Sequence, residues 1–119
     1  MSDMQQIGFA AEELACRFLQ KQGLRLISRN YRCKTGEIDL IMQENLILVF
    51  VEVRFRKNEF FGTSAETVTY TKQKKLIKAA QFYLQQHRCE NRPCRFDVIA
   101  MTSRNSKSEI EWIKDAFST

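Results

Sequence analysis

Hydrophobic residues repeat along this chain with two different periods, and these periods predict its helices and strands. From about Asp3 to Gln22, apolar residues recur at helical spacing and Gly23 supplies the stop. The expected buried stripe of this helix is Ile7, Ala11, Leu14, Ala15, Phe18 and Leu19. A second helix is expected from about Thr71 to His87, with a buried stripe of Leu76, Ile77, Ala80, Tyr83 and Leu84.

The remaining apolar segments read as strands. Arg25 to Tyr31 alternates well enough for a short edge strand, and Gly36 to Arg56 is expected to form a β-hairpin. The second arm of this hairpin is apolar on both faces from Leu46 to Val53, which is typical of a central strand covered on both sides. Two more strands are expected at Arg95 to Met101 and around Glu109 to Ile113. This order predicts a single α/β domain over residues 1–119, with a helix on each side of its sheet.

Glu52 interrupts the apolar run of the hairpin. A lone carboxylate buried in a sheet costs several kcal/mol, roughly, unless a cation accompanies it. Two turns fit the hairpin: a turn at Glu44 and Asn45 places Glu52 diagonally from Asp39, and a turn at Asn45 and Leu46 places it directly opposite. In both registers the two acids share a face at about 4.5 to 8 Å between backbone positions, so both can reach one ion. Two oxygen ligands with room for water suit Mg²⁺ at a phosphate-processing site.

Charge and absent motifs narrow the chemistry. The net charge of +5 modestly favours an acidic partner such as nucleic acid. The chain shows no secretory signal and no apolar run near the ~20 residues that span a bilayer, so we expect a cytoplasmic protein without a membrane partner. It has no phosphate-binding glycine loop, and its single histidine leaves few candidates for a Ser-His-Asp or Cys-His mechanism. This elimination favours metal-assisted hydrolysis of a phosphodiester.

Other residues flank the acidic pair. Glu12 borders the apolar stripe of the first helix, and Lys72 lies at the edge of the buried face of the second helix, from where it can reach inward. The side chains on the other side of this helix include Lys74, Lys75 and Lys78. This basic face either contacts phosphate groups or is simply exposed to solvent. The loop from Lys57 to Thr67 carries Phe60 and Phe61. These aromatic side chains either contact the substrate or pack locally within the loop.

Ordered sequence blocks along almost the whole chain resemble the bacterial YraN family. The blocks are Gly8 and Glu12-x-x-Ala15, Asn30 to Arg32, Gly36 to Ile41, Val49 to Arg54, Lys72 with Leu76, Arg95 to Ile99 and Glu111 to Phe117. That family is similar to the restriction-endonuclease-like superfamily with the PD-(D/E)xK signature, and in particular to Holliday-junction resolvases. The resemblance implies a restriction-endonuclease-like core, in which a mixed central sheet is flanked by helices on both sides.

The signature can be carried over residue by residue. Asp39 matches its aspartate, Glu52 its second acid, Arg54 its basic position, and Glu12 the helix-borne acid of the resolvases. Ile38 replaces the proline, which is a tolerable loss. Arg54 replaces the lysine, which matters more because arginine effectively never deprotonates.

The resemblance therefore implies Mg²⁺ or Mn²⁺ bound by Asp39, Glu52 and Glu12. Arg54 would act as a charge clamp, Lys72 would replace the missing lysine, and Glu37 is a candidate support or an ordinary strand-entry acid. The implied function is a DNA endonuclease for branched or damaged DNA, and a homodimer is expected if the target is a four-way junction, which needs two cuts. The alternatives are a nuclease-derived module that binds DNA or a protein partner without cleaving, and a structural protein in which Glu52 pairs with Arg54 or Arg56.

Overall fold

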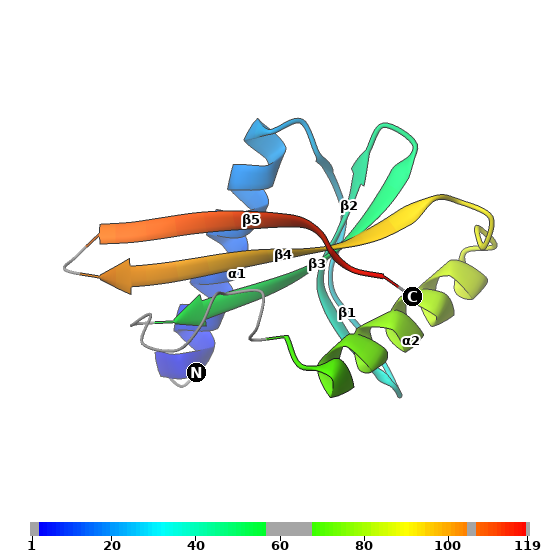
Figure 1. Cartoon of the computed structure of the whole chain (residues 1–119), viewed down its shortest axis with the longest axis horizontal. Coiled ribbons are helices and arrows are strands. Elements are labelled where there is room, and N and C mark those ends of the chain that lie inside the picture. Colours follow the sequence, from blue (N-terminus) through cyan, green and yellow to red (C-terminus); the bar gives the residue numbers. More distant parts are fainter. Residues whose placement is uncertain (1–2, 57–67, 105–106, 119) are drawn as a thin grey trace.

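A computed structural model describes residues 3–56, 68–104 and 107–118, and it shows a five-stranded mixed sheet with two helices (Figure 1). The elements are α1 (Asp3–Lys21), β1 (Arg25–Cys33), β2 (Gly36–Glu44), β3 (Ile47–Arg56), α2 (Tyr70–Gln86), β4 (Cys94–Arg104) and β5 (Lys107–Phe117). The strands lie side by side in chain order. Among the described strands, only β3 and β4 pair in parallel, and α2 lies between them in sequence. This is the α/β order that the apolar periods predict, and it is consistent with a restriction-endonuclease-like core.

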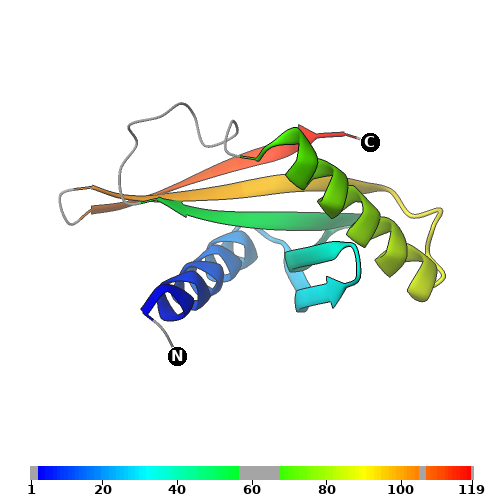
Figure 2. The same ribbon diagram turned by 90° about the horizontal axis from the view of Figure 1, so that it is seen from below.

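The two helices contribute to separate hydrophobic cores. The α1 core contains Ala11, Ala15, Cys16, Leu19 and Leu24 with Leu40, Met42, Val49, Val51, Ile99 and Met101 of the strands. The α2 core contains Val68, Leu76, Ala79, Ala80, Tyr83 and Leu84 with Ile38, Ile41, Leu48, Phe50, Phe96 and Val98. Strands lie between α1 and α2 in Figure 2. The central strand β3 contributes to both cores, which explains why its sequence is apolar on both faces.

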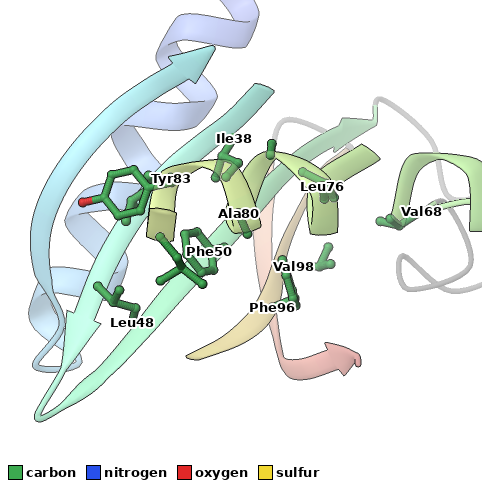
Figure 3. Packing of buried hydrophobic residues seen from close by; sticks show 12 residues of the cluster. Ile38, Leu48, Phe50, Val68, Leu76, Ala80, Tyr83, Phe96 and Val98 are labelled. Atoms are coloured by element: carbon green, nitrogen blue, oxygen red, sulfur yellow. The ribbon is translucent and has the colours of Figure 1, made fainter. Parts of the chain in front are cut away.

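Aromatic rings organise the α2 core. Tyr83 of α2 packs edge-on near Phe50, with 6.0 Å between the ring centroids, and both residues are labelled in Figure 3. Phe50 also stacks on Phe96, at 5.5 Å between ring centroids. Near the other end of the cluster, Ile38 lies close to Leu76 and Ala80 (Figure 3). These contacts hold α2 against β2, β3 and β4.

The predicted helix faces need two corrections. Leu14 was expected in the α1 core but is half exposed, and Cys16 is buried instead. The buried line of α1 passes through Ala11, Ala15 and Leu19, so the helix is rotated away from Leu14. In α2, Ala79 is fully buried whereas Ile77 is only partly buried. Small alanines let both helices approach the sheet closely, and periodicity alone does not reveal this. The expected burial of Ile7 lies outside the described side chains.

The last strand is longer than its pattern predicts. β5 runs over Lys107–Phe117 instead of Glu109 to Ile113. A shift in the β4–β5 register and a positive φ of 51° at Asp115 let the strand continue. Phe117 then stacks on Phe96 with 4.9 Å between ring centroids, so the end of the chain closes the α2 core. In the described part of the chain, neither helix is both long and apolar enough to span a bilayer.

Candidate active site

The hairpin between β2 and β3 adopts the second of the two expected registers. Glu44 pairs with Ile47, so Asn45 and Leu46 form the turn, and Asn45 has a φ of 54° that suits asparagine. The last recorded pair is Leu40 with Val51. One further step in the same register places Asp39 across from Glu52.

Asp39 lies where the ladder between β2 and β3 ends. The backbone N–H of Val53 donates a hydrogen bond to Asp39 Oδ2 at 2.8 Å. A side-chain carboxylate thus takes the place of a backbone carbonyl as the acceptor, and this contact fixes its position. The bond favours the charged form of Asp39, but burial is the larger effect, so the pKa of Asp39 is raised.

Glu52 is the more unusual of the two acids because its side chain is only 5% exposed. Its Oε1 lies 3.8 Å from Arg54 Nη1 and 3.8 Å from Lys72 Nζ. Its Oε2 is buried and accepts no hydrogen bond in the described part of the protein. Burial first, and then the charge of Asp39, raise the pKa of Glu52 to about 7, although Lys72 and Arg54 oppose the rise. The group is a buried carboxylate that the two nearby cations compensate only in part.

Glu12 reaches the same region from α1. Burial raises its pKa, and the charges of Asp39 and Glu37 raise it further, whereas a hydrogen bond from the Asn30 side chain lowers it. Its Oε1 is also buried without a hydrogen-bond partner among the described residues. Within residues 3–56, 68–104 and 107–118, however, no three His, Cys, Asp or Glu side chains form a group that could hold a metal ion. Asp39 and Glu52 therefore remain the better candidates for ligands, and the free Oε2 of Glu52 fits that role.

Lys72 reaches the site because α2 begins just before it. Thr69 caps the helix, and its hydroxyl oxygen accepts a hydrogen bond from the Lys72 backbone N–H at 3.2 Å. One turn later, α2 passes close to the start of β2. A Cβ on Gly36 would lie 3.3 Å from the backbone oxygen of Lys75 and 3.4 Å from its Cβ. Gly36 thus allows the close approach that lets Lys72 extend to Glu52.

We expect Gly36→Ala to push α2 outward by a few tenths of an ångström. The added methyl group should destabilise the protein by about 1 to 3 kcal/mol, the usual cost of overpacking. Because the charge of Lys72 lowers the pKa of Glu52, a retreat of Lys72 should raise that pKa further. Urea unfolding and an NMR pH titration of the Glu52 carboxyl carbon measure the two effects.

Gly8→Ala is the matched control for this substitution. Gly8 lies in α1 with no atom near enough to touch an added Cβ, so alanine there should stabilise the helix by about 0.5 to 1 kcal/mol. If Gly36→Ala were as stable as the unmodified protein and left the Glu52 titration unchanged, the close approach would not position Lys72.

Two other acids near the site have surface partners. Glu37 forms an exposed ion pair with Arg32 at 3.3 Å, so it contributes to the site through its charge. Glu13 on α1 pairs with Arg17 at 3.1 Å and with Arg29. The aromatic loop with Phe60 and Phe61 lies outside the described residues.

A buried polar network lies farther along the sheet and was missed by the sequence pattern. The Asp97 carboxylate has no exposed side-chain surface and accepts four hydrogen bonds at 2.9 to 3.2 Å. The donors are Arg95 Nε to both oxygens, Trp112 Nε1 and the backbone N–H of Asp115. Arg95 Nη1 also donates to Glu44 at 2.8 Å. These bonds tie β5 to β4, and Arg95 Nη2 is buried without a hydrogen-bond partner among the described residues. The aspartate of RFDVI is the only trace of it in the sequence.

Comparison with known proteins agrees with the sequence blocks. The model of the family described as "Uncharacterised protein family UPF0102" matches residues 11–101. A UPF0102 protein of Nitrosococcus oceani is 51% identical over 111 residues, which cover 92% of this chain and 90% of the relative. One from Stutzerimonas stutzeri is 48% identical over 118 residues, with 98% of both chains covered. The family model and the two relatives align with the helices and strands that form the site. The chain therefore belongs to the UPF0102 family, which is the YraN family that its sequence blocks resemble.

Proposed function

We propose that this protein is an endonuclease that hydrolyses DNA phosphodiester bonds with the help of a divalent cation. One observation carries the proposal: two acids, Asp39 and Glu52, lie where β2 and β3 separate, and Glu52 has Lys72 and Arg54 near its Oε1 while its buried Oε2 lacks a hydrogen-bond partner among the described residues. A protein that used Glu52 only for structure would gain by satisfying that oxygen. Perturbed acids with specific charged neighbours are typical of functional sites.

Each residue of the site has a role in this proposal. Asp39, held by the Val53 N–H, and Glu52 would bind Mg²⁺ or Mn²⁺, with Glu12 near enough to interact with the charge of Asp39. When bound, the cation would supply charge stabilisation for the phosphate oxygens and activate water. Arg54 and Lys72 would contact the phosphate and stabilise the negative charge that develops on it. Arg54 remains protonated throughout, so it acts as a clamp and not as a base.

The substrate and setting follow from the same resemblance. The similarity of the site to that of Holliday-junction resolvases favours branched DNA, and we place the protein in the cytoplasm, where bacterial DNA is accessible. Two symmetric cuts across a four-way junction would require a homodimer.

A second candidate is a DNA-binding module without cleavage activity, and Arg54 in the place of the signature lysine favours it. The two candidates differ in how they respond to metal and to loss of the acids. If the protein only binds, then neutralising Asp39 should leave DNA affinity unchanged or improve it, because a negative charge is removed from the surface that faces phosphate.

The deciding experiment titrates Mg²⁺ and Mn²⁺ into the unmodified protein and into Asp39→Asn by calorimetry. Both proteins are then incubated with linear, single-stranded and four-way-junction DNA. Cleavage that requires the cation and is lost in Asp39→Asn supports the nuclease. Tight DNA binding with neither cation binding nor cleavage of any substrate supports the binding module and contradicts the nuclease.

A further inference from the structure

A groove of about 530 Å³ lies between α2 and the turn that joins β1 to β2. It is lined by Arg32, Cys33, Lys34, Thr35 and Phe82. The Phe82 side chain is 48% exposed even though the sheet-facing side of the same helix is buried. The groove thus combines an open aromatic ring with two basic side chains and a hydroxyl group. This size is within the range that binds small organic groups.

The two segments that form the groove are entirely without acidic residues. Residues 32–36 and 70–86 together carry six basic residues, Arg32, Lys34, Lys72, Lys74, Lys75 and Lys78. Their charge alone exceeds the net +5 of the whole chain. Lys72 lies in the first turn of α2, where the positive end of the helix dipole disfavours cations. Lys74 and Lys78 line a separate hollow on α2, so the cations within the groove itself are Arg32 and Lys34. Because no acid in either segment offsets these charges, this part of the surface is complementary to a polyanion.

The groove is continuous with the proposed active site through shared elements. Gly36 ends the turn against Lys75 of α2, and Asp39 follows three residues later on β2. Lys72, which approaches Glu52, precedes Phe82 by ten residues on the same helix, or about 15 Å at 1.5 Å per residue. At about 3.4 Å per nucleotide of one strand, that distance corresponds to about four nucleotides.

We propose that this groove binds an unpaired stretch of the DNA substrate, with one base stacked on Phe82 and neighbouring phosphates contacted by Arg32 and Lys34. The inference rests on the proposed function for its choice of DNA, and it narrows the substrate to DNA that carries a single-stranded segment about four nucleotides from the bond that is cut. An aromatic ring beside basic side chains is the usual way to bind unpaired bases of any sequence. The exposed ion pair of Arg32 with Glu37 is weak enough for a phosphate to replace Glu37.

The test compares Phe82→Ala with Phe9→Ala by fluorescence anisotropy of labelled DNA in the absence of divalent cations. Both residues are exposed aromatics on helices, but Phe9 belongs to α1, which packs in the other core. Phe82→Ala should weaken binding of single-stranded DNA about tenfold and of blunt duplex less than about twofold. Phe9→Ala should change neither. In Phe82→Trp, single-stranded DNA should still bind and should quench the new tryptophan.

The charge contribution is measured by salt dependence. Removing Arg32 and Lys34 together should flatten the slope of log affinity against log salt for single-stranded DNA by about 1 to 1.5, and Lys21→Ala on α1 should not. If Phe82→Ala and Phe9→Ala bound single-stranded DNA with equal affinity, the proposal that the groove binds unpaired DNA would be wrong. It would also be wrong if Phe82→Ala weakened binding of duplex and of single-stranded DNA by the same factor. Because no cation is present, these results do not depend on cleavage. If the protein cleaved no DNA but Phe82→Ala still weakened binding of single-stranded DNA, the proposed nuclease activity would be contradicted and the proposed DNA-binding role of the groove would stand.

Discussion

Glu52→Gln is expected to lower the rate of DNA cleavage by at least about a thousandfold and, at the same time, to make the protein more stable above pH 7. The loss of activity follows from the loss of a charged ligand and of electrostatic stabilisation, contributions that are typically worth about 10² to 10³ each. The gain in stability follows from burial. Glutamine keeps the shape of the side chain but removes a charge that is only 5% exposed and partly compensated.

The pH dependence of stability has a definite sign. The pKa of Glu52 rises from 4.5 in the unfolded chain to about 7 in the folded protein, so the folded state binds the proton more tightly. Stability must therefore fall as the pH rises from about 4.5 through about 7, by about 3 kcal/mol in total. Asp39, whose pKa is also raised, adds a loss in the same direction. In Glu52→Gln the first of these losses should disappear.

Urea unfolding from pH 4 to pH 9 without divalent cations measures this difference. Glu37→Gln is the control, since Glu37 is an exposed acid on the neighbouring strand β2 and should change stability by less than about 0.5 kcal/mol. Added Mg²⁺ should restore stability to the unmodified protein at pH 8 and leave Glu52→Gln unaffected. A Glu52→Gln variant that is less stable at pH 8 would show that the carboxylate is a structural ion pair.

Asp97→Ala should produce the largest loss of stability in the protein, about 3 to 5 kcal/mol. The substitution removes the acceptor of four hydrogen bonds. It also takes from Arg95, whose side chain is only 14% exposed, one of the two carboxylates that it pairs with, so that only Glu44 remains of the pair. Trp112 Nε1 and the Asp115 N–H lose their partner as well. Because these donors belong to β5, we expect β5 to detach from β4 first.

Urea unfolding gives the size of the effect, and hydrogen exchange shows where it acts. Amide protons of β5 should exchange faster, whereas those of β2 and β3 should keep most of their protection. Arg17→Ala breaks only an exposed ion pair with Glu13 and should cost less than about 0.5 kcal/mol. A double replacement, Arg95→Met with Asp97→Leu, should recover part of the stability because it removes both buried charges together. A cost below about 1 kcal/mol for Asp97→Ala would contradict the role of the network.

Much of the fold follows from local pattern. The limits of α1, α2 and the hairpin agree with the apolar periods to within a few residues, and the central position of β3 follows from its two apolar faces. The errors concern contacts between distant residues. Leu14 is exposed because alanines bring α1 close to the sheet, and β5 is extended because Phe117 stacks on Phe96. No local period encodes either contact.

For the site, the amino-acid sequence alone predicts that Asp39 and Glu52 lie on adjacent strands and that Glu52 needs a compensating cation, because strand alternation and the cost of burying charge act locally. The hairpin register, the hydrogen bond from Val53 to Asp39 and the approach of Lys72 to Glu52 become clear only in the folded protein. The approach of Lys72 depends on where α2 packs, through contacts such as Gly36 with Lys75 and Phe50 with Tyr83, which join residues more than thirty positions apart in sequence.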